Sequence, residues 1–222
     1  MNWIDLGNPV PRQEAHTCAP VSWPAGMVWP FPQLPDRPAI SFDKVRLRRR
    51  SGRTFLTPTD GQLGELLGLT CRVQFTISDI YGFPQTHRPP PSAGAIHPVN
   101  VIVHTAGEPS WARYDPFDHA LVELPARIAP PTVRIAMEEV LPAGGATLLL
   151  FAAQPALTFA KYEHACSLVW RDAGVLQGYL SMAAESLGLN FCLIGVTGEP
   201  WVSRLIDEGA LVGVGAAYVG AP

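Results

Sequence analysis

The stretch "CSLVWRDAGVLQGYLSMAAESLGLNFCLIGV", residues 166–196, decides the fold of this chain. Between residue 165, directly before this stretch, and residue 187, apolar and small residues recur at intervals of three and four, which places them on one face of an α-helix. These residues are Ala165, Leu168, Val169, Ala173, Leu176, Leu180, Ala183, Ala184 and Leu187. Gly188 supplies a helix stop, and the apolar run "LNFCLIGV" after it predicts a strand. The stretch therefore predicts a long amphipathic helix followed by a sheet strand.

The segments around this stretch alternate between helix and strand patterns. Helix patterns begin at Ser41 or Asp43, at Thr59 or Asp60, and over residues 130–141 and 197–209, the last with Pro200 in its first turn. Strand patterns cover residues 99–106, 111–124 (a hairpin with its turn at 115–118), 146–153 and 210–220. Together they predict an α+β domain with a mixed sheet flanked by helices.

The first 40 residues have a different composition. They hold eight prolines and three tryptophans, too many prolines for a helix or a central strand but too many aromatic residues for a free tail. We therefore expect two parts: a proline-rich N-terminal arm over residues 1–40, packed on the body or on a second subunit, and one folded domain over residues 41–222.

Composition excludes several classes of protein. Hydrophobic residues make up 47% of the chain and charged residues only 16%, which favours a subunit that buries a face against a partner. No apolar run approaches the roughly 20 residues of a membrane span, and the N-terminus lacks a secretory pattern, so we expect a cytoplasmic protein without membrane contact. The four cysteines have no CxxC spacing and the histidines form no cluster, so we expect no metal site.

A basic cluster, "RRRSGRTF" at residues 48–55, leaves three interpretations open. It is a solvated helix end, a nucleic-acid patch, or a compact site for one phosphate gripped by guanidinium groups and a serine hydroxyl. The net charge of −3 disfavours nucleic acid. The density of donors fits the phosphate site best, and it predicts a phosphorylated small ligand. Neither of the common glycine-rich phosphate motifs is present.

Four segments, in this order and spacing, resemble the nitroreductase superfamily and, within it, the SagB/McbC-type azoline dehydrogenases. They are "RRSGRTF", "PSAGAIHP", "YDPFDHALVEL" and "KYEHACSLVWRDAGVLQGYLSMAAESLGLNFCLIG". The resemblance runs from about residue 41 to residue 220. It implies an FMN-dependent homodimer with two flavins bound at the subunit interface.

The resemblance also implies which residues hold FMN. The phosphate and ribityl chain would be held by Arg49, Arg50, Ser51 and Arg53. The flavin ring would be lined by Pro91, Ser92, Ala93 and Gly94, and Ile194 and Gly195 would lie beside its N5 edge. Two departures stand out. Ala95 replaces the loop asparagine of general nitroreductases, as in the azoline-dehydrogenase branch. No basic residue that helps to hold the phosphate stands near the C-terminus, which implies either weaker FMN binding or compensation by Arg48.

The same resemblance places a catalytic Lys-Tyr pair at Lys161 and Tyr162, directly before the long helix. Aromatising an azoline ring removes a C–H proton while a hydride leaves for the flavin. A lysine serves as the base only if an apolar pocket lowers its pKa, and the tyrosine, with its high pKa, suits a donor. The alternative is a solvated lysine beside a core tyrosine.

The leading functional hypothesis is therefore an FMN-dependent oxidoreductase that converts azolines, or related dihydro rings, to azoles in a peptide or peptide-like natural product. Such an enzyme implies a peptide or carrier-bound substrate and a cyclodehydratase partner, and no nucleic acid. One alternative is an NAD(P)H-dependent nitro or quinone reductase. Another is a flavin-binding subunit of a biosynthetic complex without turnover of its own.

Overall fold

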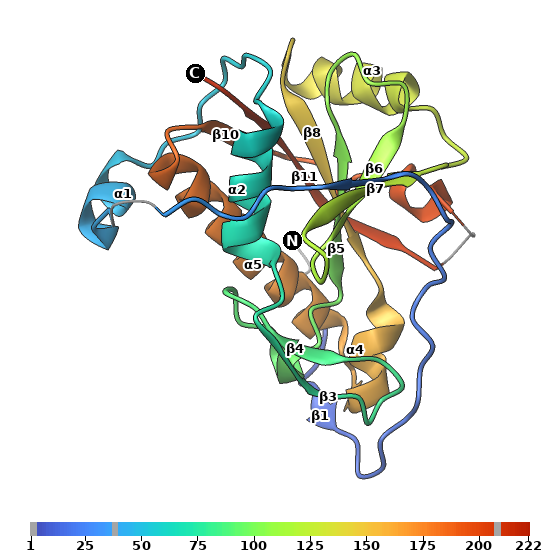
Figure 1. Cartoon of the computed structure of the whole chain (residues 1–222). Helices are drawn as coiled ribbons and strands as arrows, with labels where there is room; N and C mark the ends of the chain where they lie inside the picture. The colour runs from blue at the N-terminus through green and yellow to red at the C-terminus, as the bar shows by residue number, and fades with distance from the viewer. Residues whose placement is uncertain (1–3, 37–39, 207–209) are drawn as a thin grey trace.

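A seven-stranded sheet forms the centre of the molecule in the computed structural model, which describes residues 4–36, 40–206 and 210–222. The strands follow the order β10-β11-β8-β5-β6-β7-β2, and each neighbouring pair is antiparallel. Their bounds are β2 Val28–Pro30, β5 Val99–His104, β6 Trp111–Asp115, β7 Ala120–Leu124, β8 Thr147–Ala153, β10 Asn190–Ile194 and β11 Val212–Gly220. The expected α+β fold is confirmed, and the sheet is antiparallel (Figure 1).

Strand β8 lies in the middle of the sheet and is buried along its whole length. Its alternate side chains enter two separate cores. Leu149 and Phe151 join the core under α2 (Asp60–Cys71) and α5 (Cys166–Ser186), whereas Leu148 and Leu150 join the core under α3 (Pro130–Val140). Because both faces of the strand are covered, its sequence is apolar throughout rather than alternating. Helices on both faces thus make a three-layer molecule (Figure 1).

The long helix α5 forms where the apolar spacing predicts it. It buries Leu168, Val169, Leu180 and Ala184 against the sheet. It ends at Ser186, and Gly188 directly after the cap residue has a φ of 70°, the left-handed conformation of a helix stop. The chain then returns along β10, so the helix and the strand run beside each other in opposite directions.

The two shorter helices upstream begin at the expected caps. Helix α1 (Phe42–Arg48) is capped by Ser41, whose Oγ accepts from Lys44 N. Helix α2 starts with a full capping box, in which Thr59 and Gln62 each accept a hydrogen bond from the other's backbone N–H. Helix α3 also forms where it is expected, with proline at its first position.

Several elements differ from the sequence predictions. The segment after β8 forms a helix, α4 (Pro155–Lys161), which Pro155 starts and whose short length hides its periodicity. A separate hairpin joins β3 (Phe75–Ser78) to β4 (Gln85–His87), although the span containing β4 reads as turns. Of the helix predicted at 197–209, the structure forms a single 3-10 turn, η2 (Val202–Arg204), and residues 207–209 lie outside the described part.

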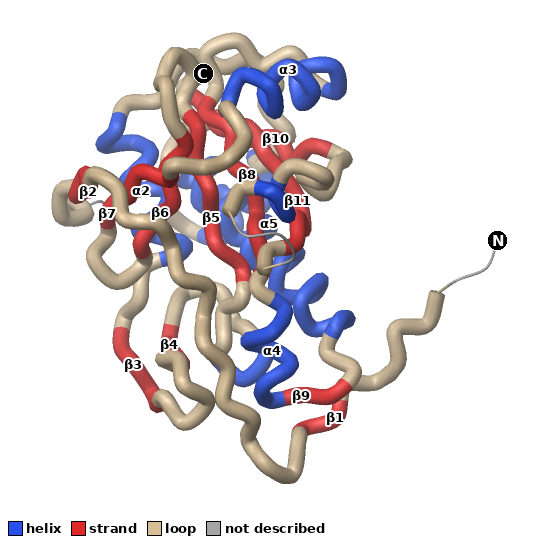
Figure 2. Tube along the Cα trace, turned by 90° about the vertical axis from the view of Figure 1, so that its right-hand side faces the viewer, coloured by secondary structure: helices blue, strands red, loops and turns tan. Residues whose placement is uncertain are grey.

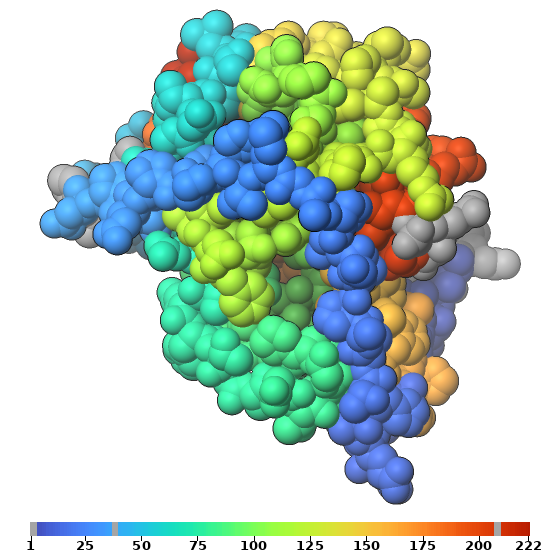
Figure 3. Space-filling view, turned by 45° about the vertical axis from the view of Figure 1, so that its right-hand side comes forward, coloured from blue at the N-terminus to red at the C-terminus, as the bar shows by residue number. Residues whose placement is uncertain are grey.

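The N-terminal arm crosses the surface of the domain and is attached at both ends (Figures 2 and 3). Strand β1 (Val10–Pro11) pairs with β9 (Tyr162–Glu163), and β2 pairs with β7 at the edge of the main sheet. An edge position tolerates Pro30, which has no N–H to donate. Between these strands Val21 N donates to Gln154 Oε1 at 2.8 Å. The arm therefore runs from the α4 end of the molecule to the far edge of the sheet.

No described helix is both long and apolar enough to cross a bilayer. Within the same residues, no three histidine, cysteine, aspartate or glutamate side chains gather in a way that could hold a metal ion.

Replacing Leu180 with alanine tests the α5 core. Leu180 is fully buried, so Leu180→Ala should lower the free energy of unfolding by about 2–5 kcal/mol through lost burial and a residual cavity. Ile135→Ala on α3 is the control, because Ile135 is 65% exposed and its loss should change stability little. Urea denaturation followed by circular dichroism measures both; equal effects would contradict the assigned packing.

Candidate functional site

The "PSAG" loop, residues 91–97, is a strained turn between β4 and β5. Its 3-10 turn η1 (Ala93–Ala95) contains Gly94 at φ 66°, and Ala95 and His97 also take positive φ values of 58° and 50°. Such values are rare for residues with a Cβ, so the surrounding contacts must hold the loop in this shape. Gln85 supplies one contact, because its Nε2 donates to Gly94 O at 2.7 Å.

Asp172 on α5 is the main anchor of this loop. Its carboxylate accepts hydrogen bonds from Ser92 Oγ at 2.5 Å and from Ala93 N at 3.1 Å. Ser92 Oγ in turn accepts from His97 N at 2.9 Å. Burial raises the pKa of Asp172, while the hydrogen bonds from Ser92 and Ala93 act in the opposite direction. The loop is therefore fixed to the long helix through one buried carboxylate.

Lys161 lies directly against this loop. A methyl group added at Gly94 would stand 2.8 Å from Lys161 Cδ and 2.9 Å from Nζ. Glycine at position 94 thus serves both the positive φ and the close approach of the lysine. The predicted lysine and the predicted loop, 67 positions apart in sequence, meet in space.

Two tyrosines flank the lysine ammonium group. Lys161 Nζ lies 5.7 Å from the ring centroid of Tyr81 and 5.7 Å from that of Tyr162. Burial, followed by the proximity of Tyr81 and Asp172, raises the pKa of Tyr162. The Tyr162 phenol therefore stays protonated at neutral pH and can donate a hydrogen bond. This agrees with the donor assignment and leaves its catalytic role a prediction.

Backbone structure places the Lys-Tyr pair. Lys161 ends α4 and Tyr162 begins β9, so the two residues lie at a junction rather than within one helix. The arm secures this junction, because Arg12 N donates to Lys161 O at 2.9 Å and Arg12 also pairs with Glu163 at 3.1 Å. The arm thus belongs to the surroundings of the candidate site.

The basic segment, residues 48–55, lies at the end of α5 opposite to Asp172. Arg49, Arg50, Ser51 and Arg53 are exposed, and within the described residues none of the three arginines forms an ion pair. Arg48 is different, because its Nε lies 3.3 Å from Glu185 on α5.

Gly52 attaches the basic segment to the start of β10. Gly52 N donates to Phe191 O at 3.2 Å, and a Cβ at Gly52 would overlap the side chain of Asn190. Asn190 Nδ2 also donates to Thr54 O at 2.8 Å. The unpaired arginines therefore project from a well-anchored turn.

Ile194 and Gly195, the pair predicted to lie beside the flavin N5 edge, have different surroundings at the end of β10. Ile194 buries its side chain in the α3-side core, so only its backbone is free for a ligand. Gly195 is exposed, with open space where a Cβ would stand. Asn190 and Ile194 lie four positions apart along β10, a span of about 13 Å. The strand thus links the basic segment to Gly195.

One chain does not bring all the predicted residues together. The Asp172 anchor and the Glu185 contact with Arg48 are 13 residues apart on α5, or about 20 Å along the helix. Figure 1 shows α4 and α1 at opposite ends of this helix. Lys161, Tyr162 and the "PSAG" loop form one group, and the arginines, with β10, form a second.

Sequence reasoning missed Asp172 and Tyr81. The sequence does indicate that Asp172 is unusual, because it lies four residues after Leu168 and three after Val169, which places a charged residue on the apolar face of the helix. A carboxylate there must find buried partners. Tyr81 had no such signal, because its loop has no periodic pattern.

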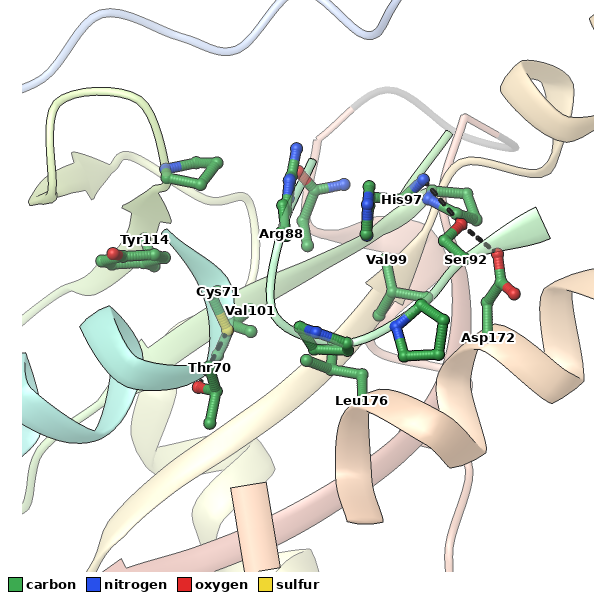
Figure 4. A pocket seen from close by; sticks show the side chains of 15 residues that line it. Thr70, Cys71, Arg88, Ser92, His97, Val99, Val101, Tyr114, Asp172 and Leu176 are labelled. Atoms are coloured by element: carbon green, nitrogen blue, oxygen red, sulfur yellow. Dashed lines mark hydrogen bonds between the residues drawn. The ribbon is translucent and has the colours of Figure 1, made fainter. Parts of the chain in front are cut away.

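A cavity of about 30 Å³ lies beside the loop, between α2, α5 and β5 (Figure 4). It is lined by Thr70, Cys71, Arg88, Pro90, Pro91, Ser92, His97, Pro98, Val99, Asn100, Val101, Tyr114, Pro116, Asp172 and Leu176. This volume holds one or two water molecules. A tricyclic ring must therefore bind on the surface rather than inside this cavity.

Comparisons with known proteins bear on the family and the fold. The model of the nitroreductase family matches residues 47–207. A protein assigned as a nitroreductase from Ralstonia eutropha JMP134 is 20% identical, with a TM-score of 0.66 over 96% of this chain and 98% of that one. The microcin synthetase McbBCD complex of E. coli, with truncated pro-MccB17 bound, contains a chain 17% identical, with a TM-score of 0.64 over 86% of this chain and 76% of its own length.

A third similar structure, from Desulfovibrio desulfuricans, is assigned as a nitroreductase in complex with FMN. It is 14% identical, with a TM-score of 0.51 over 81% of this chain and 84% of that one. At these identities the likenesses show the fold alone. No curated protein matches the chain.

Replacing Asp172 with asparagine tests the buried carboxylate. A pKa raised above the usual 3.8 means that folding favours the protonated acid, so its contribution to stability is lost as pH rises through the folded-state pKa. The amide introduced by Asp172→Asn cannot titrate, and its oxygen can still accept from Ala93 N. Relative to wild type, the variant should therefore gain stability as the pH rises from about 4 toward neutral. Urea denaturation across this range measures the difference.

Glu139→Gln controls for the loss of one surface carboxylate. Parallel pH profiles for Asp172→Asn and wild type would contradict the assigned environment of Asp172.

Proposed function

The chain belongs to the nitroreductase family, and we propose that it is an FMN-dependent oxidoreductase that dehydrogenates azoline rings in a peptide or peptide-like natural product. The observation that carries this proposal is the contact between Lys161 and Gly94, because it sets a proton-handling side chain on the loop assigned to the flavin. The fold is that of an oxidoreductase family; the azoline substrate is the proposed part.

The residues of the second group fit the FMN tail. Three unpaired guanidinium groups at Arg49, Arg50 and Arg53, together with the Ser51 hydroxyl, offer a dense set of donors for a phosphate. Gly195 leaves its backbone open to a flat ligand at the other end of β10. The likeness to an FMN complex supports this assignment.

A homodimer would bring the two groups of residues to the same cofactor. Within one chain about 20 Å of α5 separates the loop anchor from the basic segment, which is too far for both to hold the same part of one cofactor. A second copy would complete each site by placing its "PSAG" loop over the first copy's β10. Exposed apolar side chains on both groups, including Phe42, Leu47, Trp170 and Leu193, support such an interface.

The proposed reaction divides between cofactor and protein. Bound FMN would supply the acceptor for the hydride that leaves the azoline ring. Lys161, as the neutral amine, would take the ring C–H proton and become the ammonium ion, and contact with Gly94 and two tyrosine rings restricts where its terminal nitrogen can lie. Tyr162, kept protonated by burial, would donate to the ring heteroatom.

The likeness to a chain of the McbBCD complex supports a role beside a cyclodehydratase that supplies the azoline. The family model favours a second candidate, an NAD(P)H-dependent nitro or quinone reductase. The two differ in the source of electrons: the substrate ring in the first, a nicotinamide in the second.

Arginine substitutions test the phosphate site. Arg50→Ala should raise the Kd for FMN on the order of tenfold to a hundredfold, because a charge-assisted hydrogen bond contributes about 1.5–3 kcal/mol. Arg46→Ala is the matched control: it removes an arginine one turn away that is already paired with Asp43 at 2.8 Å. FMN titration with fluorescence detection measures both. Unchanged affinity on replacing each of Arg49, Arg50 and Arg53 would refute the phosphate site.

Lys161→Met tests the base. Anaerobic mixing with a thiazoline-containing peptide should bleach the flavin of the wild-type protein, and the variant should do so at least about a hundredfold more slowly while still binding FMN. Lys44→Met, which replaces the other lysine of the chain, should behave as wild type. Bleaching by NADPH but not by the thiazoline would establish the reductase instead. Bleaching by neither would leave a flavin-binding subunit without turnover.

A further inference from the structure

The cavity beside the "PSAG" loop contains an arginine without an acidic partner. Arg88 follows β4, and its Nε donates to Thr86 Oγ1 at 3.0 Å. Within the described residues no carboxylate forms an ion pair with it. Asp115, whose charge acts on Arg88, is already paired with Arg113 at 2.9 Å. Arg88 therefore lines the cavity without an ion-pair partner among the described residues.

The neighbouring groups that can ionise do not supply the missing charge. Burial raises the pKa of Cys71 to about 11, so its thiol is neutral, and burial lowers the pKa of His97 to about 3, so its ring is neutral too. Burial lowers the pKa of Arg88 only to about 10, which leaves it charged at neutral pH. Asp172, which also lines the cavity, is committed to Ser92 and Ala93.

The cavity walls define the chemistry of a ligand. Four prolines, two valines and a leucine make most of the lining apolar, and Arg88 and His97 lie along one side of it (Figure 4). A planar guanidinium matches a carboxylate in two parallel hydrogen bonds. With one cation available, a monoanion is balanced, whereas a phosphate dianion would keep one charge uncompensated next to apolar walls.

Size and access add a further restriction. The volume of about 30 Å³ admits a carboxylate but not a larger body. Arg88 follows β4 and Pro116 belongs to the turn after β6, and Figure 3 shows a hollow between these two parts of the surface, bordered by the N-terminal arm. The rest of a ligand can lie in this hollow while its acid group enters.

We propose that the cavity is a carboxylate-binding site in which Arg88 pairs with the acid group of a small organic molecule. The site does not depend on the flavin. Two sources share this chemistry: a free organic acid, or a carboxylate carried by the substrate, and only the second rests on the proposed function. Pro91 and Ser92 line the cavity and also belong to the "PSAG" loop, so an occupant contacts the loop that Lys161 touches.

Calorimetric titration of the purified full-length chain tests the site. The probes are benzoate, its neutral analogue benzamide, and N-acetylphenylalanine as a mimic of a peptide carboxyl end. We expect benzoate or N-acetylphenylalanine to bind, and benzamide to bind at least about tenfold more weakly. In Arg88→Met the acid should lose at least about tenfold in affinity. Arg72→Met is the control, since Arg72 follows Cys71 but does not line the cavity, and should change affinity less than about twofold.

A second measurement needs no variant, in case Arg88→Met does not fold. Ser92 and His97 line the cavity, so hydrogen exchange of the loop backbone between them, quantified by mass spectrometry, reports occupancy. Benzoate should slow it, and benzamide should not. Equal behaviour of acid and amide in both measurements, or no binding of either acid, would overturn the proposal.

The source of the carboxylate is read from turnover. If the substrate carries it, amidation of a thiazoline acid lowers kcat/KM at least about tenfold and benzoate competes with it. If a free acid is the ligand, benzoate binds without competing. Binding is measured without turnover, so failure of the azoline reaction would refute the proposed function without affecting the test of the carboxylate site.

Discussion

The hydrogen bonds between Asp172 and the "PSAG" loop hold the candidate site together. A carboxylate on the buried face of a helix is unfavourable unless donors satisfy it. Ser92 and Ala93 supply these donors, and in doing so they fix a loop in which Ala95 and His97 carry strained backbone angles. Once the loop is fixed, Gly94 presents a surface without a side chain, and Lys161 packs there. A single buried charge thus couples the long helix, the strained loop and the lysine.

Much of the fold follows from the sequence because its main elements have strong local signals. The apolar spacing of α5, the capping residues Ser41 and Thr59, and the glycine stop at Gly188 each act within a few residues. The apolar run at 147–153 likewise predicts the central strand. What could not be predicted depends on distant contacts: β3 and β4 are held by each other and by Ser78 and Gln85, whose side chains hydrogen-bond, rather than by any periodic pattern.

The candidate site divides in the same way. Motifs predict functional roles for the lysine, the loop and the arginines, and these roles stay predictions; the structure brings Lys161 against Gly94. Their division into two groups at opposite ends of α5 could not be read from sequence, since spacing along the chain carries no distance in space. Arg88 was passed over because a single arginine in a proline-rich span has the same appearance whether it faces solvent or a cavity.

The attachment of the N-terminal arm has a consequence for folding. Strand β1 meets β9 across about 150 positions of sequence and through only two residues on each strand, whereas α5 and β10 are neighbours in the chain. Closing so long a loop is costly in entropy, so this pairing forms after the core and is released before it. We therefore expect the Lys161 junction to close after the central sheet. Its ordering can be lost while the central sheet remains intact.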